Sequence, residues 1–297
     1  MEVVSMVMRM RAVVDDLRRL GRRVALVPTM GALHEGHLSL VRMARERGAE
    51  VVVSLFVNPA QFGPEEDNAA YPRDLTLDCE LLMRESVAAV FAPEPGEIYP
   101  SGHATYVDVA GLSDILTGAH RPGHFRGVTT VVMALLDIVR PDLAVFGWKD
   151  AQQLVILQRM VRDLHVQVEL LGAPTVREAD GLAASSRNAR LDAESRKAAT
   201  AIHRALQEAI RLVDAGERSP QKIEESVTTA LAREPLLEVD YVRAVSAKDL
   251  SDLKRLQGLV LVLVSVKAKL AGRPPVLLVD NVRIEVEEEP APPRRAP

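Results

Sequence analysis

The sequence predicts an α/β protein, with a doubly wound, Rossmann-like parallel sheet followed by a second, smaller α+β domain. Short apolar runs rich in β-branched residues alternate along the chain with segments in which apolar residues recur at helical spacing. The runs are continuously apolar, which is typical of parallel strands buried on both faces. Aromatic residues make up only 3% of the chain, so we expect a core of valine, leucine, alanine and isoleucine. Such a core suits a parallel sheet covered by helices.

The first predicted domain spans residues 1–174 and contains these alternating elements. Its strands end at proline or in polar loops, and several of its helices end at glycine or proline. In chain order we predict a strand at 24–27, a helix at 36–47, a strand at 51–57, a helix at 75–87, a strand at 90–91, a helix at 127–139, a strand at 143–146, a helix at 151–163 and a strand at 166–171. Ligands of such sheets bind at the carboxyl ends of the strands.

The pattern changes after Pro174. Residues 175–188 are polar and predict a hinge that carries a phosphate-binding Ser-Ser-Arg motif, and residues 189–286 predict a small α+β lid domain. Within this domain we expect helices at 193–215 and 221–233, followed by strands at 239–245, 259–266 and 276–279. The tail at 287–297 combines charge with repeated proline and is predicted to be disordered.

Composition and charge exclude several classes of protein. The chain has 297 residues with 37 basic and 41 acidic side chains, and the net charge of -4 provides no overall basic surface for nucleic acid. No apolar run reaches the length of a membrane helix. The single Cys79 excludes an internal disulfide and a thiolate zinc site. The apolar N-terminus is followed by charged residues without a small-residue cleavage site, so we expect a cytoplasmic protein.

The most informative stretch is Pro-Thr-Met-Gly-Ala-Leu-His-Glu-Gly-His at residues 28–37, between a predicted strand and a predicted helix. A helix N-terminus binds anions because its free backbone amides and its dipole both face the ligand. Gly31 and Gly36 let the backbone approach closely, and His34 and His37 can donate hydrogen bonds to the same phosphate. The stretch therefore predicts a phosphate site.

The sequence does not match other well-known nucleotide-binding or metal-binding motifs. His37 and Leu38 stand where a Walker A loop requires lysine and serine or threonine, and no GxGxxG follows a strand. The metalloprotease motif HExxH needs two more residues between Glu35 and the second histidine. His120 and His124 are four residues apart, but Pro122-Gly123 between them argues against a shared helical face.

Further polar groups follow other predicted strands. Asn58 and Gln61 offer amide groups suited to hydroxyl and carboxylate oxygens. Lys149 can neutralise triphosphate oxygens, and Asp150 can help to hold magnesium or a ribose. Two hydroxyls and a guanidinium at residues 185–187 suit phosphate oxygens.

Together these segments carry a family resemblance. Residues 28–37 resemble the HxGH signature of the nucleotidylyltransferase superfamily, in which the two histidines stabilise the α-phosphate as pyrophosphate leaves. Three further segments, FVNPAQF at 56–62, FGWKDAQQL at 146–154 and READGLAASSRN at 177–188, resemble the pantoate–β-alanine ligases. The match covers nearly the whole chain except the proline-rich tail.

The resemblance implies an ATP-dependent ligase that uses Mg²⁺ and joins pantoate to β-alanine through an acyl adenylate. It also implies a homodimer, while charge and hydropathy predict neither nucleic acid nor membrane partners. His34, His37 and Lys149 are the expected catalytic groups, and Gln61, Gln153 and Asn58 the expected contacts of pantoate and β-alanine. Val176 is expected to contact adenine through its backbone, residues 185–187 to form a mobile KMSKS-like element, and Asp150 to hold magnesium. The expected ATP contacts are Met30, Gly31, Ala32, Leu33, His34, Glu35, Gly36, His37, Gly147, Trp148, Lys149, Asp150, Val176, Ala184, Ser185, Ser186 and Arg187.

Three residues depart from the family pattern. Ala184 stands where methionine is usual, Trp148 replaces a smaller polar residue, and Ala60 replaces leucine. None of them removes a group that performs chemistry. Two alternatives stay open: another HxGH nucleotidylyltransferase, and a non-catalytic nucleotide-binding module. The base that deprotonates β-alanine also stays open among His34, His37 and water.

Overall fold

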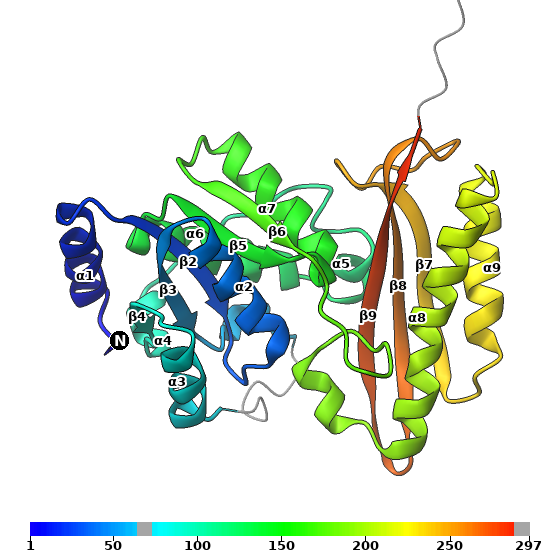
Figure 1. Cartoon of the computed structure of the whole chain (residues 1–297), viewed down its shortest axis with the longest axis horizontal. Helices are drawn as coiled ribbons and strands as arrows, with labels where there is room; N and C mark the ends of the chain where they lie inside the picture. The colour runs from blue at the N-terminus through cyan, green and yellow to red at the C-terminus, as the bar shows by residue number, and fades with distance from the viewer. Residues whose placement is uncertain (64–72, 288–297) are drawn as a thin grey trace, which may run out of the picture. The chain divides into compact units, whose positions relative to one another are not determined.

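A computed structural model describes residues 1–63 and 73–287, and in it the chain divides into two compact units (Figure 1). The first unit comprises Met1–Arg177 with Ala184–Ser186, and the second comprises Glu178–Ala183 with Arg187–Pro297. The chain thus passes between the units inside the segment predicted as a hinge. Residues 288–297 of the tail predicted to be disordered lie outside the described residues.

The first unit is built on a six-stranded sheet of order β1-β4-β3-β2-β5-β6 in which all neighbours run parallel. The predicted parallel α/β architecture is therefore confirmed. Its strands are β1 (Glu2–Val4), β2 (Arg23–Thr29), β3 (Ala49–Leu55), β4 (Ala89–Phe91), β5 (Leu143–Gly147) and β6 (Glu169–Ala173).

Helices cover both faces of this sheet. The buried residues of α1 (Val7–Arg19), α6 (His124–Val139) and α7 (Ala151–Asp163) pack against one face, and those of α2 (Glu35–Glu46) and α3 (Leu75–Arg84) against the other. Within β2, Val24 and Leu26 face the first layer whereas Ala25 and Val27 face the second. Both faces are apolar for this reason. The short helices are η1 (Pro59–Gln61), α4 (Pro95–Ile98), α5 (Thr117–His120) and η2 (Trp148–Asp150).

The strand order places a topological switch point between β2 and β5. From β2 the chain proceeds through α2 to β3 on one side of the sheet, whereas from β5 it proceeds through α7 to β6 on the other. The connections that leave the carboxyl ends of β2 and β5 therefore diverge, and ligands of such sheets bind at a switch point of this kind. Residues 30–37 follow β2 at this point, and residues 148–150 follow β5.

The structure corrects three element predictions. The N-terminus, for which no element was predicted, forms β1 and α1, and the Met6 N-cap has no side-chain hydrogen bond that could have signalled a helix start. Strand β6 begins at Glu169 instead of residue 166, because the Val166 N–H closes the end of α7 on the carbonyl of Val161. Strand β9 (Arg273–Val286) is much longer than the predicted 276–279, since its pairing with β8 continues past its apolar centre.

The second unit confirms the predicted α+β class. Two helices, α8 (Ala193–Asp214) and α9 (Pro220–Ala232), pack against an antiparallel sheet of order β7-β8-β9, which is formed by β7 (Leu237–Ser246), β8 (Gly258–Leu270) and β9. Helix η3 (Ser186–Arg190) precedes them. Asp192 and Ser219 cap α8 and α9 through side-chain oxygens that accept N–H groups of the first turns.

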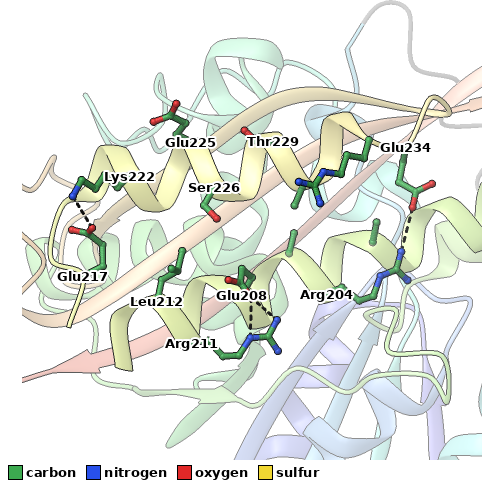
Figure 2. A pocket seen from close by; sticks show the side chains of 14 residues that line it. Arg204, Glu208, Arg211, Leu212, Glu217, Lys222, Glu225, Ser226, Thr229 and Glu234 are labelled. Atoms are coloured by element: carbon green, nitrogen blue, oxygen red, sulfur yellow. Dashed lines mark hydrogen bonds and ion pairs between the residues drawn. The ribbon is translucent and has the colours of Figure 1, made fainter. Parts of the chain in front are cut away.

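An open groove of about 920 Å³ runs between α8 and α9 (Figure 2). Three of its cations pair with carboxylates: Arg204 with Glu234 at 3.2 Å, Arg211 with Glu208 at 2.5 Å and Lys222 with Glu217 at 3.0 Å. These three cations are therefore paired with carboxylates of the same unit. None of the helices in residues 1–63 and 73–287 combines the length and the hydropathy of a membrane span.

Candidate active site

The two histidines of the HxGH segment are held by the start of α2. His34 is the N-cap, and its Nδ1 accepts the N–H of Gly36 at 3.1 Å. The N–H of His34 in turn donates to Nδ1 of His37 at 3.3 Å, so that the two imidazoles form a reciprocal capping box. Their ring centroids lie 4.1 Å apart. The spacing of three residues therefore places both rings at the same helix N-terminus.

This capping determines where the ring protons lie. Each Nδ1 accepts a backbone N–H, so each ring carries its proton on Nε2 and is neutral. The arrangement presents two Nε2–H donors at the positive end of a helix dipole. Neutral donors of this kind can bind a phosphate oxygen but do not supply a full positive charge.

The electrostatics of His37 agree with this protonation state. Desolvation, followed by the positive charges of His34, when it is protonated, and of Lys149, lowers the pKa of His37 to about 3, although Asp150 acts in the opposite direction. Lys149 and Asp150 from the end of β5 are thus close enough to act on a histidine that follows β2. This proximity is what the switch point predicts.

We expect His37 to stay neutral throughout the physiological range. In an NMR titration of the ligand-free protein, its Cε1–H resonance should show no midpoint between pH 5 and 8. Because the folded pKa of about 3 lies below the unfolded value of 6.5, the unfolded chain binds more protons between these values. The free energy of unfolding should therefore fall as the pH drops from about 6.5 toward 3. Loss of the resonance in His37→Ala would assign it, and a midpoint near 6.5 would contradict the lowered pKa.

The loop before α2 is held by Asp78, a residue that sequence reasoning missed. The buried Asp78 carboxylate accepts the N–H groups of Ala32 at 3.0 Å and Leu33 at 2.8 Å. Gly31 has φ +82°, and a Cβ there would lie 2.9 Å from Asp78 Oδ2. Burial raises the pKa of Asp78, whereas the two amide hydrogen bonds lower it. Asp78 on α3 thus determines the path of the loop.

These contacts correct the prediction of free backbone amides. The N–H of Gly31 donates to Thr29 Oγ1 at 3.2 Å, and the next amides are used by Asp78 and by the histidine caps. The amides of Ala32 and Leu33 are satisfied within the protein because α3 supplies a carboxylate 46 and 45 residues away. Anion binding here would therefore rely mainly on the imidazoles, Lys149 and the helix dipole.

Two other residues predicted to contact ATP, Leu33 and Glu35, have side chains that contact other residues of the protein. The exposed Glu35 carboxylate pairs with Arg42, further along α2. The side chain of Leu33 packs against the core between the sheet and α2. These two side chains support the loop and the helix.

Lys149 and Asp150 lie in η2, directly after β5. The Lys149 ammonium is 3.2 Å from Asp150 Oδ1, and the lysine side chain is 19% exposed whereas the aspartate is 51% exposed. The preceding Trp148 packs against the core, and a Cβ on Gly172 would clash with its Nε1. Trp148 therefore supports the end of β5, while Lys149 and Asp150 bring charge to the switch point.

Asn58 and Gln61 both follow β3, but Asn58 is buried whereas Gln61 is half-buried. Asn58 is 1% exposed, and its side chain makes four hydrogen bonds within the protein, so the prediction that it offers its amide to a ligand needs correction. Gln61 is half-buried, and its Nε2 donates to Met30 Sδ at 3.0 Å.

Helix α7 carries two neighbouring glutamines. Gln152 is buried and its side chain forms hydrogen bonds with the 112–117 segment, whereas Gln153 is half-buried.

The remaining predicted contacts divide between the two units. In the first unit, the Ala184 N–H donates to the carbonyl of Val176 at 2.9 Å, and Ser185 and Ser186 follow directly. Arg187 belongs to the second unit. The loop 178–183 of that unit is tied to α8, because Arg196 pairs with both Glu178 and Asp180.

The described residues 1–63 and 73–287 contain no group of three histidine, cysteine or acidic side chains able to hold a metal ion. His120 and His124 lie in separate helices, α5 and α6, as the intervening proline and glycine predicted. Asp150 is the predicted magnesium residue. A single carboxylate can suffice for Mg²⁺ when phosphates and water complete its coordination.

A parallel α/β sheet whose switch point brings an HxGH helix N-terminus together with a lysine defines the class of nucleotidylyltransferase-type enzymes. The family model described as pantoate-beta-alanine ligase matches residues 2–283. The chain therefore belongs to the pantoate–β-alanine ligase family.

Relatives and solved structures agree with this assignment. The pantothenate synthetase of Moorella thermoacetica is 49% identical over 288 residues, which cover 97% of this chain and 100% of that protein. That of Acetivibrio thermocellus is 46% identical over 286 residues, which cover 96% and 100%. The crystal structure of pantothenate synthetase from Thermus thermophilus matches with a TM-score of 0.88 and 44% identity, covering 95% of this chain and 99% of that one. A Francisella tularensis pantoate-beta-alanine ligase complexed with beta-gamma ATP and beta-alanine matches with a TM-score of 0.76 and 28% identity, covering 95% and 97%.

Proposed function

We propose that this chain catalyses the ATP-dependent ligation of (R)-pantoate and β-alanine to pantothenate. The proposal is supported by its family membership and by the ATP and β-alanine named for the Francisella tularensis ligase. One observation carries it furthest: two neutral Nε2–H donors and the Lys149 ammonium approach one another at the switch point of the sheet. An uncharged donor pair next to a cation suits a phosphate that gains charge as pyrophosphate leaves.

The proposed reaction has two steps. A pantoate carboxylate oxygen attacks the α-phosphorus of ATP, a P–O bond breaks, and pyrophosphate leaves with the electron pair. The β-alanine nitrogen, as the unprotonated amine, then attacks the carbonyl carbon of pantoyl adenylate. The bond from this carbon to the phosphate oxygen breaks, AMP leaves with the electron pair, and the nitrogen gives up a proton as the amide bond forms. Activation is needed because a free carboxylate has no adequate leaving group.

In this scheme the residues act by orientation and charge stabilisation. His34 and His37 donate to α-phosphate oxygens, and Lys149 neutralises the departing pyrophosphate. Gln61 and Gln153 bind pantoate through their side-chain amides. Ser185, Ser186 and Arg187 bind the nucleotide phosphates, and the backbone at Val176 binds adenine.

Magnesium belongs to the proposal through Asp150. The half-exposed carboxylate at the start of α7 fits an ion that keeps several water ligands and binds mainly to the triphosphate. Such an ion would neutralise phosphate charge when bound. Asp78 is not proposed as its ligand, since both of its oxygens already accept backbone amides.

The test is to supply ATP, Mg²⁺ and pantoate without β-alanine and to follow pyrophosphate and enzyme-bound adenylate. Stoichiometric pyrophosphate is expected, followed by AMP and pantothenate once β-alanine is added. Pyrophosphate that appears only with β-alanine would contradict the stepwise scheme. Tight ATP binding without any turnover would instead favour a non-catalytic nucleotide-binding module.

Replacing Gln61 by alanine should raise the KM for pantoate by about tenfold and leave the KM for ATP within twofold. The expected size corresponds to about 1.4 kcal/mol, the net value of one side-chain hydrogen bond in the binding site. Steady-state kinetics with each substrate varied in turn measure both constants. Gln158→Ala, on an exposed position of α7, is the matched control. A rise confined to the ATP constant would show that the pantoate site is assigned wrongly.

On the family resemblance we also propose that the enzyme is a cytoplasmic homodimer. Sedimentation equilibrium at micromolar concentration tests the dimer, and a single species with the mass of one chain would contradict it.

A further inference from the structure

Gln61 is held by hydrogen bonds from its own loop and from the start of α6. Its side-chain Oε1 accepts the Nδ2 of Asn58 at 3.1 Å. Its backbone carbonyl accepts from Nδ1 of His124 at 2.8 Å. The Nε2 of His124 faces an Arg121 nitrogen at 3.2 Å, and because arginine can only donate, the ring proton of His124 must lie on Nδ1. Both the backbone and the side chain of Gln61 are therefore positioned.

The orientation of the Asn58 amide follows from its partners. Oδ1 accepts the N–H of Ala60 at 3.2 Å and the hydroxyl of Tyr99 at 2.8 Å, while Nδ2 donates to Gln61 and to the carbonyl of Gly127 at 3.0 Å. A reversed amide would place NH₂ against the N–H of Ala60 and oxygen against the Gly127 carbonyl. The buried Asn58 thus has one allowed orientation, and all four of its hydrogen-bonding positions are used.

The backbone of α6 brings this arrangement close to η1. A Cβ on Gly127 would overlap the carbonyl oxygen of Ala60, so only glycine permits this approach. The same Gly127 carbonyl anchors Asn58. The loop that carries Gln61 is therefore packed backbone to backbone against a helix.

Tyr99 completes the chain of hydrogen bonds from the end of α4. Its ring contacts Phe56 and His103, with centroids 6.2 Å and 5.0 Å away. Burial raises the pKa of Tyr99 to about 12, so the phenol keeps its proton at working pH and can donate to Asn58. Since Asn58 in turn donates to Gln61 Oε1, the Gln61 amide is left with its N–H groups directed away from Asn58 and toward Met30.

We propose that Tyr99 is a positioning residue for pantoate, which acts through Asn58 to present the Gln61 amide as a hydrogen-bond donor. The inference rests on the proposed function, in which Gln61 binds pantoate. A donor-only amide selects an oxygen acceptor, such as a hydroxyl or carboxylate oxygen of the substrate. Tyr99 itself touches no reacting atom.

The test is a double-mutant cycle between Tyr99→Phe and Gln61→Ala, with KM measured separately for pantoate, ATP and β-alanine. Tyr99→Phe should raise the KM for pantoate by about threefold to tenfold, as expected for one neutral hydrogen bond, with kcat and the KM for ATP within twofold. In the Gln61→Ala background, Tyr99→Phe should change the KM for pantoate by less than twofold, because the group that it positions is gone. KM does not depend on the fraction of folded enzyme, so partial unfolding cannot mimic this pattern.

Tyr106→Phe is the matched control. Tyr106 is an exposed tyrosine that contacts the Arg126 guanidinium at 4.0 Å and is not hydrogen-bonded to Asn58. Its loss of a hydroxyl should leave all three constants unchanged. Tyr99→Phe with an unaltered KM for pantoate, or with the full effect still present in Gln61→Ala, would overturn the proposed relay. Wild-type enzyme that forms no pyrophosphate would instead overturn the proposed function.

Discussion

Replacing His37 by alanine is expected to slow adenylate formation by about a hundredfold or more. The variant loses the Nε2–H donor and also the acceptor for the His34 N–H. The expected size is that of removing one preorganised donor from a transition state that develops charge. Rapid-quench measurement of pyrophosphate in the absence of β-alanine isolates this step from amide formation.

Two companion variants separate donation from helix capping. His37→Gln can place an amide N–H near the position of Nε2 and should recover part of the rate, whereas His37→Asn reaches only the position of Nδ1 and should not. His165→Asn, at an exposed residue with φ +54° after α7, is a control for loss of an imidazole elsewhere. A His37→Ala enzyme that forms adenylate at a near-normal rate would remove His37 from the mechanism.

Replacing Asp78 by alanine is expected to lower kcat/KM for ATP by about tenfold to a hundredfold, although the side chain lies on α3 and is buried away from solvent. The substitution leaves the N–H groups of Ala32 and Leu33 without their acceptor and frees a loop that contains two positive φ angles, at Gly31 and Ala32. Each unsatisfied amide costs about 1–3 kcal/mol, and a small displacement of a catalytic group can cost about a hundredfold in rate.

Asp78→Asn is the conservative test of the same contact. Asparagine offers only one acceptor, so its NH₂ would face one of the two amide N–H groups, and we expect an intermediate loss of kcat/KM with a lowered Tm. Asp74→Asn keeps the length of the N-cap side chain of α3 and its Oδ1 acceptor for Leu77, and it should change kinetics little. Wild-type kinetics in Asp78→Asn would show that the loop keeps its path without the carboxylate.

Local pattern accounts for most of what could be predicted. The strands β2, β3 and β5 and the helices α2, α7, α8 and α9 were predicted within a few residues, because each has a clear apolar period and a terminating glycine, proline or polar loop. Strand β1 was missed because it has three residues and is a strand only through its pairing with β4. The end of β9 was missed for the same reason, since its polar positions extend a ladder with β8.

The candidate site divides in the same way. The sequence by itself determined the start of the HxGH helix and the family, together with the resemblance of segments 56–62, 146–154 and 177–188 to the pantoate–β-alanine ligases. Each of these features depends on residues close together along the chain. Only the tertiary structure decided that Asp78 occupies the loop amides, that Asn58 is buried, and that Tyr99 is linked to Gln61. The hydrogen bonds of Asp78 with the loop and of Tyr99 with Asn58 join residues more than 40 positions apart, whereas Asn58 and Gln61 are three positions apart. A hydrogen bond of that range depends on how strands and helices pack, and no local spacing in the chain records it.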